Sequence, residues 1–193
     1  MDNITDRILP DCYLYISHLD TDYQYWPLPC YPDSVSDSMA SNFQSTNALG
    51  RSAPVYTYSS SGPRTVNITL RFHRDMFEDD IRYAHITTLP GEDKADHFIR
   101  ALQAISVPKY NLSNKAIEPP LVAVRLGREV FIKGVVTSSV NVTYHKPILV
   151  NEKYAGMQIS FTISEVDPYD STTVFQNGSF RGMTATLRQG MHF

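Results

Sequence analysis

YAGMQISFTISEV, residues 154–166, carries the clearest structural signal in the chain. Apolar side chains fall on every second residue and polar ones fill the positions between, which is the period of a strand with one buried and one wet face. RTVNITLRFH, residues 64–73, alternates in the same way. Both segments are longer than the usual strand of about six residues. They predict a β-rich core built on Met157, Ile159, Phe161 and Ile163 and on Val66, Ile68, Leu70 and Phe72.

The polar faces of these two strands need solvent, a lumen or another subunit against them. Either face could line a lumen, and the sequence alone does not choose between them. The two sets are Thr65, Asn67, Thr69 and Arg71 in the first strand and Gln158, Ser160, Thr162 and Ser164 in the second.

Three shorter segments complete a predicted four-stranded antiparallel meander with residues 154–166. LVAVRLG at 121–127 and EVFIKGVVTS at 129–138 are separated by a tight turn, and SVNVTYHK follows at 139–146. Gly134 interrupts the second segment, where we expect a bulge or kink.

One amphipathic helix is expected within residues 93–108. Apolar residues recur at helical spacing, Asp93 is a suitable N-cap and Pro108 ends the segment. The predicted fold class is therefore α+β, mainly β.

Residues 1–63 give weaker signals and are predicted to be irregular, apart from a short strand at 12–17. The prolines of YWPLPCYPD (25–33) are unsuited to a helix or a central strand, so we expect an extended arm. Val55, Tyr56 and Tyr58 could pair with residues 64–73 as a hairpin. Residues 167 to 193 lack periodicity, which predicts either a second arm or a disordered end.

Composition favours one globular domain. The chain has 193 residues, 42% hydrophobic and 19% charged, and a net charge of −3, which disfavours sequence-independent binding of nucleic acid. Residues 1–50 hold seven Asp and one basic residue, Arg7, so they carry −6 and the remainder carries +3. No signal peptide or membrane-spanning run is expected. Cys12 and Cys30 are expected to be thiols in a reducing cytoplasm.

The sequence contains no motif that specifies catalysis, so no catalytic, cofactor or metal residue is predicted and no enzyme activity is expected. HRD at 73–75 reads as an ion-paired strand end, and EDD at 78–80 as a solvated loop rather than a cation site. Arg64, Arg71 and Arg74 could form a basic stripe, but no RNA-recognition signature accompanies them.

Four segments in this order resemble the tube-domain proteins of phage contractile tails. They are RTVNITLRFHRDM (64–76), the helix DHFIRALQAI followed by Pro119-Pro120, LVAVRLGREVFIKGVVTSSVNVTY (121–144) and YAGMQISFTISEVDPYD (154–170). The resemblance is greatest to tube-initiator and baseplate-hub subunits. It implies a two-sheet, barrel-like domain at 53–170 with the helix outside. The resemblance does not extend to the extended N-terminal arm expected at 1–52 or to the tail at 171–193.

The resemblance also implies a function by assembly. Six copies would close a ring that joins the tail tube to the baseplate in the virion and lets DNA pass without sequence-specific binding. Trp26, Tyr56 and Tyr58 are the predicted subunit contacts. The alternatives are a baseplate wedge or assembly protein without a lumen, a small hydrolase using His73 or His145, and a carbohydrate- or nucleic-acid-binding domain.

Overall fold

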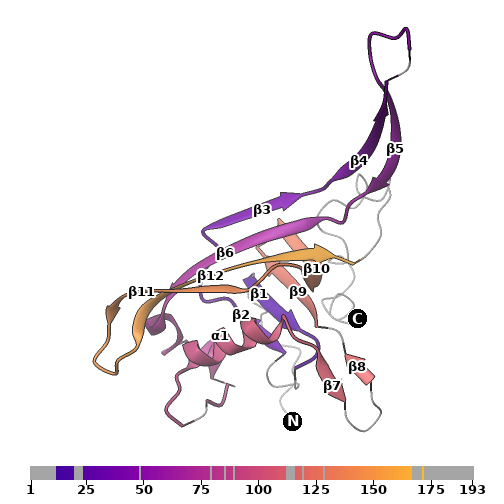
Figure 1. Cartoon of the computed structure of the whole chain (residues 1–193). Helices are drawn as coiled ribbons and strands as arrows, with labels where there is room; N and C mark the ends of the chain where they lie inside the picture. Colours follow the sequence, from indigo (N-terminus) through magenta and orange to yellow (C-terminus); the bar gives the residue numbers. More distant parts are fainter. Residues whose placement is uncertain are drawn as a thin grey trace.

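The computed structural model describes residues 12–19, 24–47, 49–78, 80–84, 86–88, 90–111, 116–118, 120–127, 129–166 and 171. These residues form a mainly antiparallel β structure with one α-helix, which confirms the predicted fold class (Figure 1). The strands are β1 (Cys12–Ile16), β2 (Tyr25–Pro27), β3 (Ser34–Ser38), β4 (Ser41–Thr46), β5 (Val55–Ser61), β6 (Thr65–His73), β7 (Lys109–Asn111), β8 (Ala116–Glu118), β9 (Leu121–Leu126), β10 (Val130–Val136), β11 (Asn141–Ile148) and β12 (Tyr154–Glu165). The helix is α1 (Lys94–Ala104), and 3₁₀ turns lie at η3 (Arg74–Phe77) and η4 (Ile81–Tyr83).

The main sheet has the order β2-β1-β9-β10-β12-β6-β3, with β11 also paired to β12. Its end strands β2 and β3 do not pair with each other in the described residues, so the sheet is open rather than a closed barrel. The separation of the chain into an arm, a domain and a tail stays a prediction. Residues 12–46 nevertheless supply β1 to β4, and β1 pairs with β9 in the interior of the sheet.

The meander predicted for residues 121–166 is wrong at one connection. β9 and β10 pair as expected, but β10 and β11 do not pair with each other; both lie along the same edge of β12. The segment between β10 and β11 does not turn back as a hairpin but runs on along β12. Two hydrogen bonds attach it there: Thr137 N donates to Thr162 O at 3.0 Å, and Thr162 N donates to Ser138 Oγ at 2.8 Å.

Gly134 is not the predicted bulge. It pairs in register with Val122 on one side and Glu165 on the other. A Cβ at this position would overlap the carbonyl group of Ser164. The glycine is therefore required by the close approach of β12 to β10, a known use of glycine within strands.

The core lies between the apolar face of the sheet and α1. Both predicted apolar faces are buried there, and β9, β1 and β10 add further side chains. α1 contributes Phe98 and Leu102, which are fully buried. The helix begins as predicted, because the Asp93 side chain caps it by accepting from Asp96 N at 2.9 Å.

Two consecutive pairings make one long bent hairpin from residues 34–46 and 55–73. β3 pairs with β6, and beyond the bend β4 pairs with β5. Gly62 N donates to Ala40 O at 2.8 Å at the bend. Figure 1 shows β4 and β5 projecting well beyond the sheet. The prediction of irregular structure here was wrong, as was the pairing of residues 55–58 with 64–73, because the partner of β5 is β4.

Candidate functional site

The two polar strand faces found in the sequence form a single surface. β6 and β12 pair with Thr65 opposite Ser164, Asn67 opposite Thr162 and Thr69 opposite Ser160. Residues directly opposite each other in an antiparallel pair point to the same side. The polar residues of β6 and those of β12 therefore lie on the same side of the sheet, opposite the core, and do not compete as alternative surfaces.

β3 and β11 widen this surface to four strands. In β3, Ser34, Ser36 and Ser38 stand opposite the polar residues of β6, and in β11 Asn141 and Thr143 stand opposite those of β12. We call this surface the polar face. Its uncharged members are Ser34, Ser36, Ser38, Thr65, Asn67, Thr69, Asn141, Thr143, Gln158, Ser160, Thr162 and Ser164.

Hydroxyl and amide groups on the polar face partner one another. Ser38 Oγ lies 2.7 Å from Thr65 Oγ1, and Arg71 Nη2 donates to Gln158 Oε1 at 3.0 Å. The basic residues of this face, Arg71, His73 and His145, stand near one end of it. Most of the surface can hold water without a fixed charge, so a polyanion finds few phosphate-binding groups along it.

The strands bordering the polar face each keep one unpaired edge among the described strands. β3 pairs only with β6 and β11 only with β12. All five residues of β3 are exposed, and β11 is exposed along most of its length. Such edges present unpaired N–H and C=O groups that can template pairing with another chain.

The β4–β5 hairpin, which we call the aromatic arm, carries exposed rings on one side. Phe43 stands opposite Tyr58, and Ser45 stands opposite Tyr56. The Phe43 and Tyr58 rings meet edge to face with centroids 5.6 Å apart. Phe43, Tyr56 and Tyr58 are 56%, 66% and 56% exposed, which leaves these aromatic groups uncovered by their own subunit.

Trp26 has a different position from the other two predicted subunit contacts. It is fully buried, with its ring centroid 5.7 Å from that of Phe98 and 5.9 Å from that of His97. Its burial places Trp26 in the core of its own subunit, which leaves Tyr56 and Tyr58 as the proposed subunit contacts.

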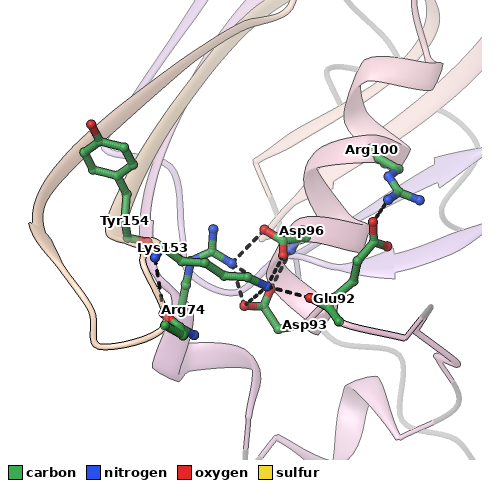
Figure 2. Close-up of polar contacts among 9 residues, drawn as sticks. Arg74, Glu92, Asp93, Asp96, Arg100, Lys153 and Tyr154 are labelled. Atoms are coloured by element: carbon green, nitrogen blue, oxygen red, sulfur yellow. Dashed lines mark hydrogen bonds and ion pairs between the residues drawn. The ribbon is translucent and has the colours of Figure 1, made fainter.

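An ionic cluster fastens the β11–β12 turn to the start of α1 (Figure 2). Arg74 is buried after β6, and its Nη1 donates to Asp93 at 2.6 Å and to Asp96 at 2.7 Å. Its Nε donates to Tyr154 O at 2.7 Å. Lys153 Nζ reaches Asp96 Oδ2 at 2.6 Å. Glu92, just before the helix, forms a separate ion pair with Arg100 of α1.

The cluster keeps Asp96 ionised. Burial acts to raise the pKa of Asp96, but hydrogen bonds from Lys153 and Arg74 and the charges of both cations outweigh it and leave the pKa lowered. Hydrogen bonding to Asp96 likewise raises the pKa of Lys153. Carboxylates at the first turn also suit the positive end of the helix dipole. This arrangement holds a turn in place and needs no ligand.

The remaining predicted candidates separate in space. Arg64 forms a bidentate pair with Asp37, with the closest contact 2.6 Å, while Arg71 lies on the polar face and Arg74 faces α1, so no basic stripe forms. HRD at 73–75 ends its strand as expected, but the acidic partners of its arginine come from α1 and its N-cap. Within 78–80, Asp80 pairs with Arg82 and Asp79 lies outside the described residues.

The described part of the chain shows no metal cluster, disulfide or membrane-spanning helix. No group of three or more His, Cys, Asp or Glu residues there could hold a metal ion. Cys12 and Cys30 carry thiols and form no disulfide with each other. No helix in that part is long and apolar enough to cross a membrane.

Solved structures that resemble the chain include two chains from gene transfer agent particles. No family model and no curated protein matches the chain. A chain in "Virion of native gene transfer agent (GTA) particle" aligns with a TM-score of 0.37 and 11% identity, covering 79% of this chain and 90% of its own length. A chain in "Tail of empty GTA particle computed with helical refinement, C6 symmetry" aligns with a TM-score of 0.39 and 13% identity, covering 83% and 96%. With TM-scores of 0.37 and 0.39, these likenesses carry no functional argument, and the function is inferred from the geometry of the chain itself.

Proposed function

We propose that this chain is a structural subunit of a phage contractile tail, which closes with copies of itself into a ring whose channel is lined by the polar face. The observation that carries the proposal is the four-stranded polar surface, uncharged over most of its extent and bordered by two unpaired edges. It agrees with the sequence resemblance to tube-domain proteins. The role is structural, and it places the protein in the virion between the tail tube and the baseplate.

Strand directions support joining at the edges. The order across the polar face is β11-β12-β6-β3, and each neighbouring pair is antiparallel. β3 of one copy would therefore lie antiparallel to β11 of the next, which extends the alternation without a break. Such a heterologous, head-to-tail contact closes into a ring if the rotation between copies is right.

Six copies would give 24 strands around the channel. At about 4.8 Å per strand the circumference is roughly 115 Å before strand tilt widens it. Barrels of 16–18 strands already leave an aqueous channel, so a ring of this size has room for a nucleic acid. Neutral hydroxyl and amide groups would let DNA slide past most of this wall with few ionic contacts.

The aromatic arm would secure the ring. An isolated two-stranded hairpin is at best marginally stable in water, and this one projects away from its own sheet (Figure 1). Packing Tyr56 and Tyr58 against an adjacent copy would cover exposed rings that suit a protein interface.

The test is the mass of the purified full chain by light scattering over a range of concentrations, with negative-stain images of the same samples. Closed rings or stacks with a central hole are expected. The matched variant is Ser36→Pro, which removes a backbone donor from β3; Ser52→Pro in the loop between β4 and β5 is its control. A wild-type chain that stays monomeric at every concentration would overturn the ring.

The second candidate is a baseplate wedge or assembly protein that uses the same strands without a lumen. The exposed edge of β3 also fits pairing with a different chain. That candidate predicts a monomer that forms a defined complex only when another tail protein is added.

A further inference from the structure

One end of the polar face differs from the rest in charge. His73 of β6 and His145 of β11 both stand opposite Gly156 of β12, so the two histidines flank a glycine across three strands. Arg71 lies two residues before His73 on the same side, opposite Gln158. Lys146 follows His145 at the point where the register of β11 shifts.

These residues line a pocket of about 240 Å³, which we call the basic pocket. Gly156 keeps its floor open: a Cβ there would lie 3.7 Å from His73 Nε2 and 3.5 Å from His145 Cβ. The side chains of Arg71, His73, His145 and Lys146 are exposed, so a solute can reach them.

The charges of the basic pocket favour an anion over a metal ion. Two histidines could share a metal, but Arg71 and Lys146 would repel it, and none of the lining residues is a carboxylate. An acidic group does lie beside Arg71: Asp33 Oδ2 is 3.6 Å from Arg71 Nε, with both side chains about half exposed. Arg71 gives one Nη2 hydrogen bond to Gln158, which leaves further guanidinium donors for a ligand.

We propose that the basic pocket binds a phosphate group of a nucleic-acid backbone, an inference that rests on the proposed function. The planar fork of arginine and the point charge of lysine are the usual partners of phosphate. In a ring, each copy would place one pocket near the same end of the channel, while the remaining wall stays neutral. DNA would then be held at one rim and slide along the rest.

The experiment measures binding of a short labelled DNA duplex to the full chain by fluorescence anisotropy at several salt concentrations. Parallel NMR titrations follow the imidazole signals of His73 and His145 with the duplex and with inorganic phosphate. We expect both ligands to move these signals. Arg71→Gln and Lys146→Gln should each weaken duplex binding about tenfold at 0.1 M salt and reduce the salt slope by about 1, as loss of one phosphate contact requires.

The matched control is Arg51→Gln, which removes an exposed cation from the loop between β4 and β5. Unchanged duplex binding by this variant supports the pocket, whereas an equal loss would show diffuse charge attraction and overturn it. Saturable binding of phosphate without duplex binding would assign the same chemistry to free phosphate and overturn the DNA assignment. No movement of either histidine signal with either ligand would overturn the site altogether.

Light scattering on the same variants separates this inference from the proposed function. Rings of the Arg71→Gln chain that bind the duplex about tenfold more weakly than wild-type rings support both the pocket and the ring. Wild-type rings without duplex binding overturn the pocket alone, and duplex binding by a chain that never forms rings overturns the ring alone.

Discussion

Two hairpins extend from opposite ends of the long β6–β12 pair, and their surroundings differ. The β11–β12 turn is fastened to its own subunit, because Lys153 and the carbonyl of Tyr154 join Arg74, Asp93 and Asp96 beside α1 (Figure 2). In the described residues, the aromatic arm makes local side-chain bonds, such as Tyr58 OH with Ser61 Oγ at 2.6 Å and Asn42 Nδ2 to Ser60 Oγ at 3.2 Å.

The difference shows that a projecting hairpin can be stabilised either by contacts within its own chain or by contacts with another chain. The β11–β12 turn is stabilised within one chain by the ion pairs of Arg74 and Lys153 with Asp93 and Asp96. At the aromatic arm, the side-chain contacts of the described residues lie within the hairpin and its rings are exposed, so a second chain is the natural source of further stabilisation. The first hairpin should therefore matter for folding of the monomer and the second for assembly.

The largest expected effect comes from Arg74→Met. The substitution removes the cation shared by Asp93 and Asp96 and the donor to Tyr154 O, leaving partly buried carboxylates with less compensation. We expect the free energy of unfolding to fall by about 3 kcal/mol, measured by urea denaturation of the monomer. Arg51→Met is the matched control and should change it by less than about 0.5 kcal/mol. Equal stability of the two variants would show that the cluster does not hold the turn.

A smaller effect is expected from Lys153→Met. Lys153 is about one quarter exposed, and Arg74 still pairs with both aspartates in its absence. The free energy of unfolding should fall by about 1 kcal/mol, within the range of partly exposed ion pairs. The double variant with Arg74→Met should lose less than the sum of the two single changes, since they share Asp96. If the losses of unfolding free energy in the two single variants were fully additive in the double variant, Arg74 and Lys153 would act independently.

The same cluster should make stability depend on pH. The pKa of Asp96 is lower in the folded chain than its ordinary value, so its contribution is fully present above the unfolded value near 4 and is lost as pH falls through the folded value. Urea midpoints between pH 7 and pH 2 should therefore fall less steeply for Asp96→Asn than for the wild type. If the urea midpoints of the two proteins fell equally steeply with pH, Asp96 would not contribute to the loss of stability in acid.

The elements with a clear sequence signal were the ones with one buried face. β6, β12 and α1 were all predicted because burial of one side imposes a period of 2 or 3.6 on the sequence. β3, β4 and β5 are exposed on both sides, so their residues show no such period. Their pairing depends on the register of the bent hairpin, which the Ser-rich sequence does not encode visibly.

The polar face and the ionic cluster differ in the same way. The polar sets of β6 and β12 were visible in the sequence, but only the register placed them on one surface. Asp93 was predicted as a cap, whereas its link to Lys153 had no local signal, because Lys153 and Asp96 are 57 residues apart. Contacts of that kind follow from tertiary packing alone.

The smallest effect on monomer stability is expected from the double change Tyr56→Ser and Tyr58→Ser in the aromatic arm. Both side chains are more than half exposed, so the free energy of unfolding of the monomer, measured by urea denaturation, should change by less than about 0.5 kcal/mol. Assembly should weaken markedly, because aromatic groups that become buried at an interface contribute much of its binding energy; light scattering would show the mass of the variant staying near that of one chain at concentrations where the wild type forms rings. Tyr31→Ser, an exposed tyrosine outside the arm, is the control and should assemble normally. A destabilised monomer with intact rings would reverse the assignment and place the order of the arm within its own subunit, as at the β11–β12 turn.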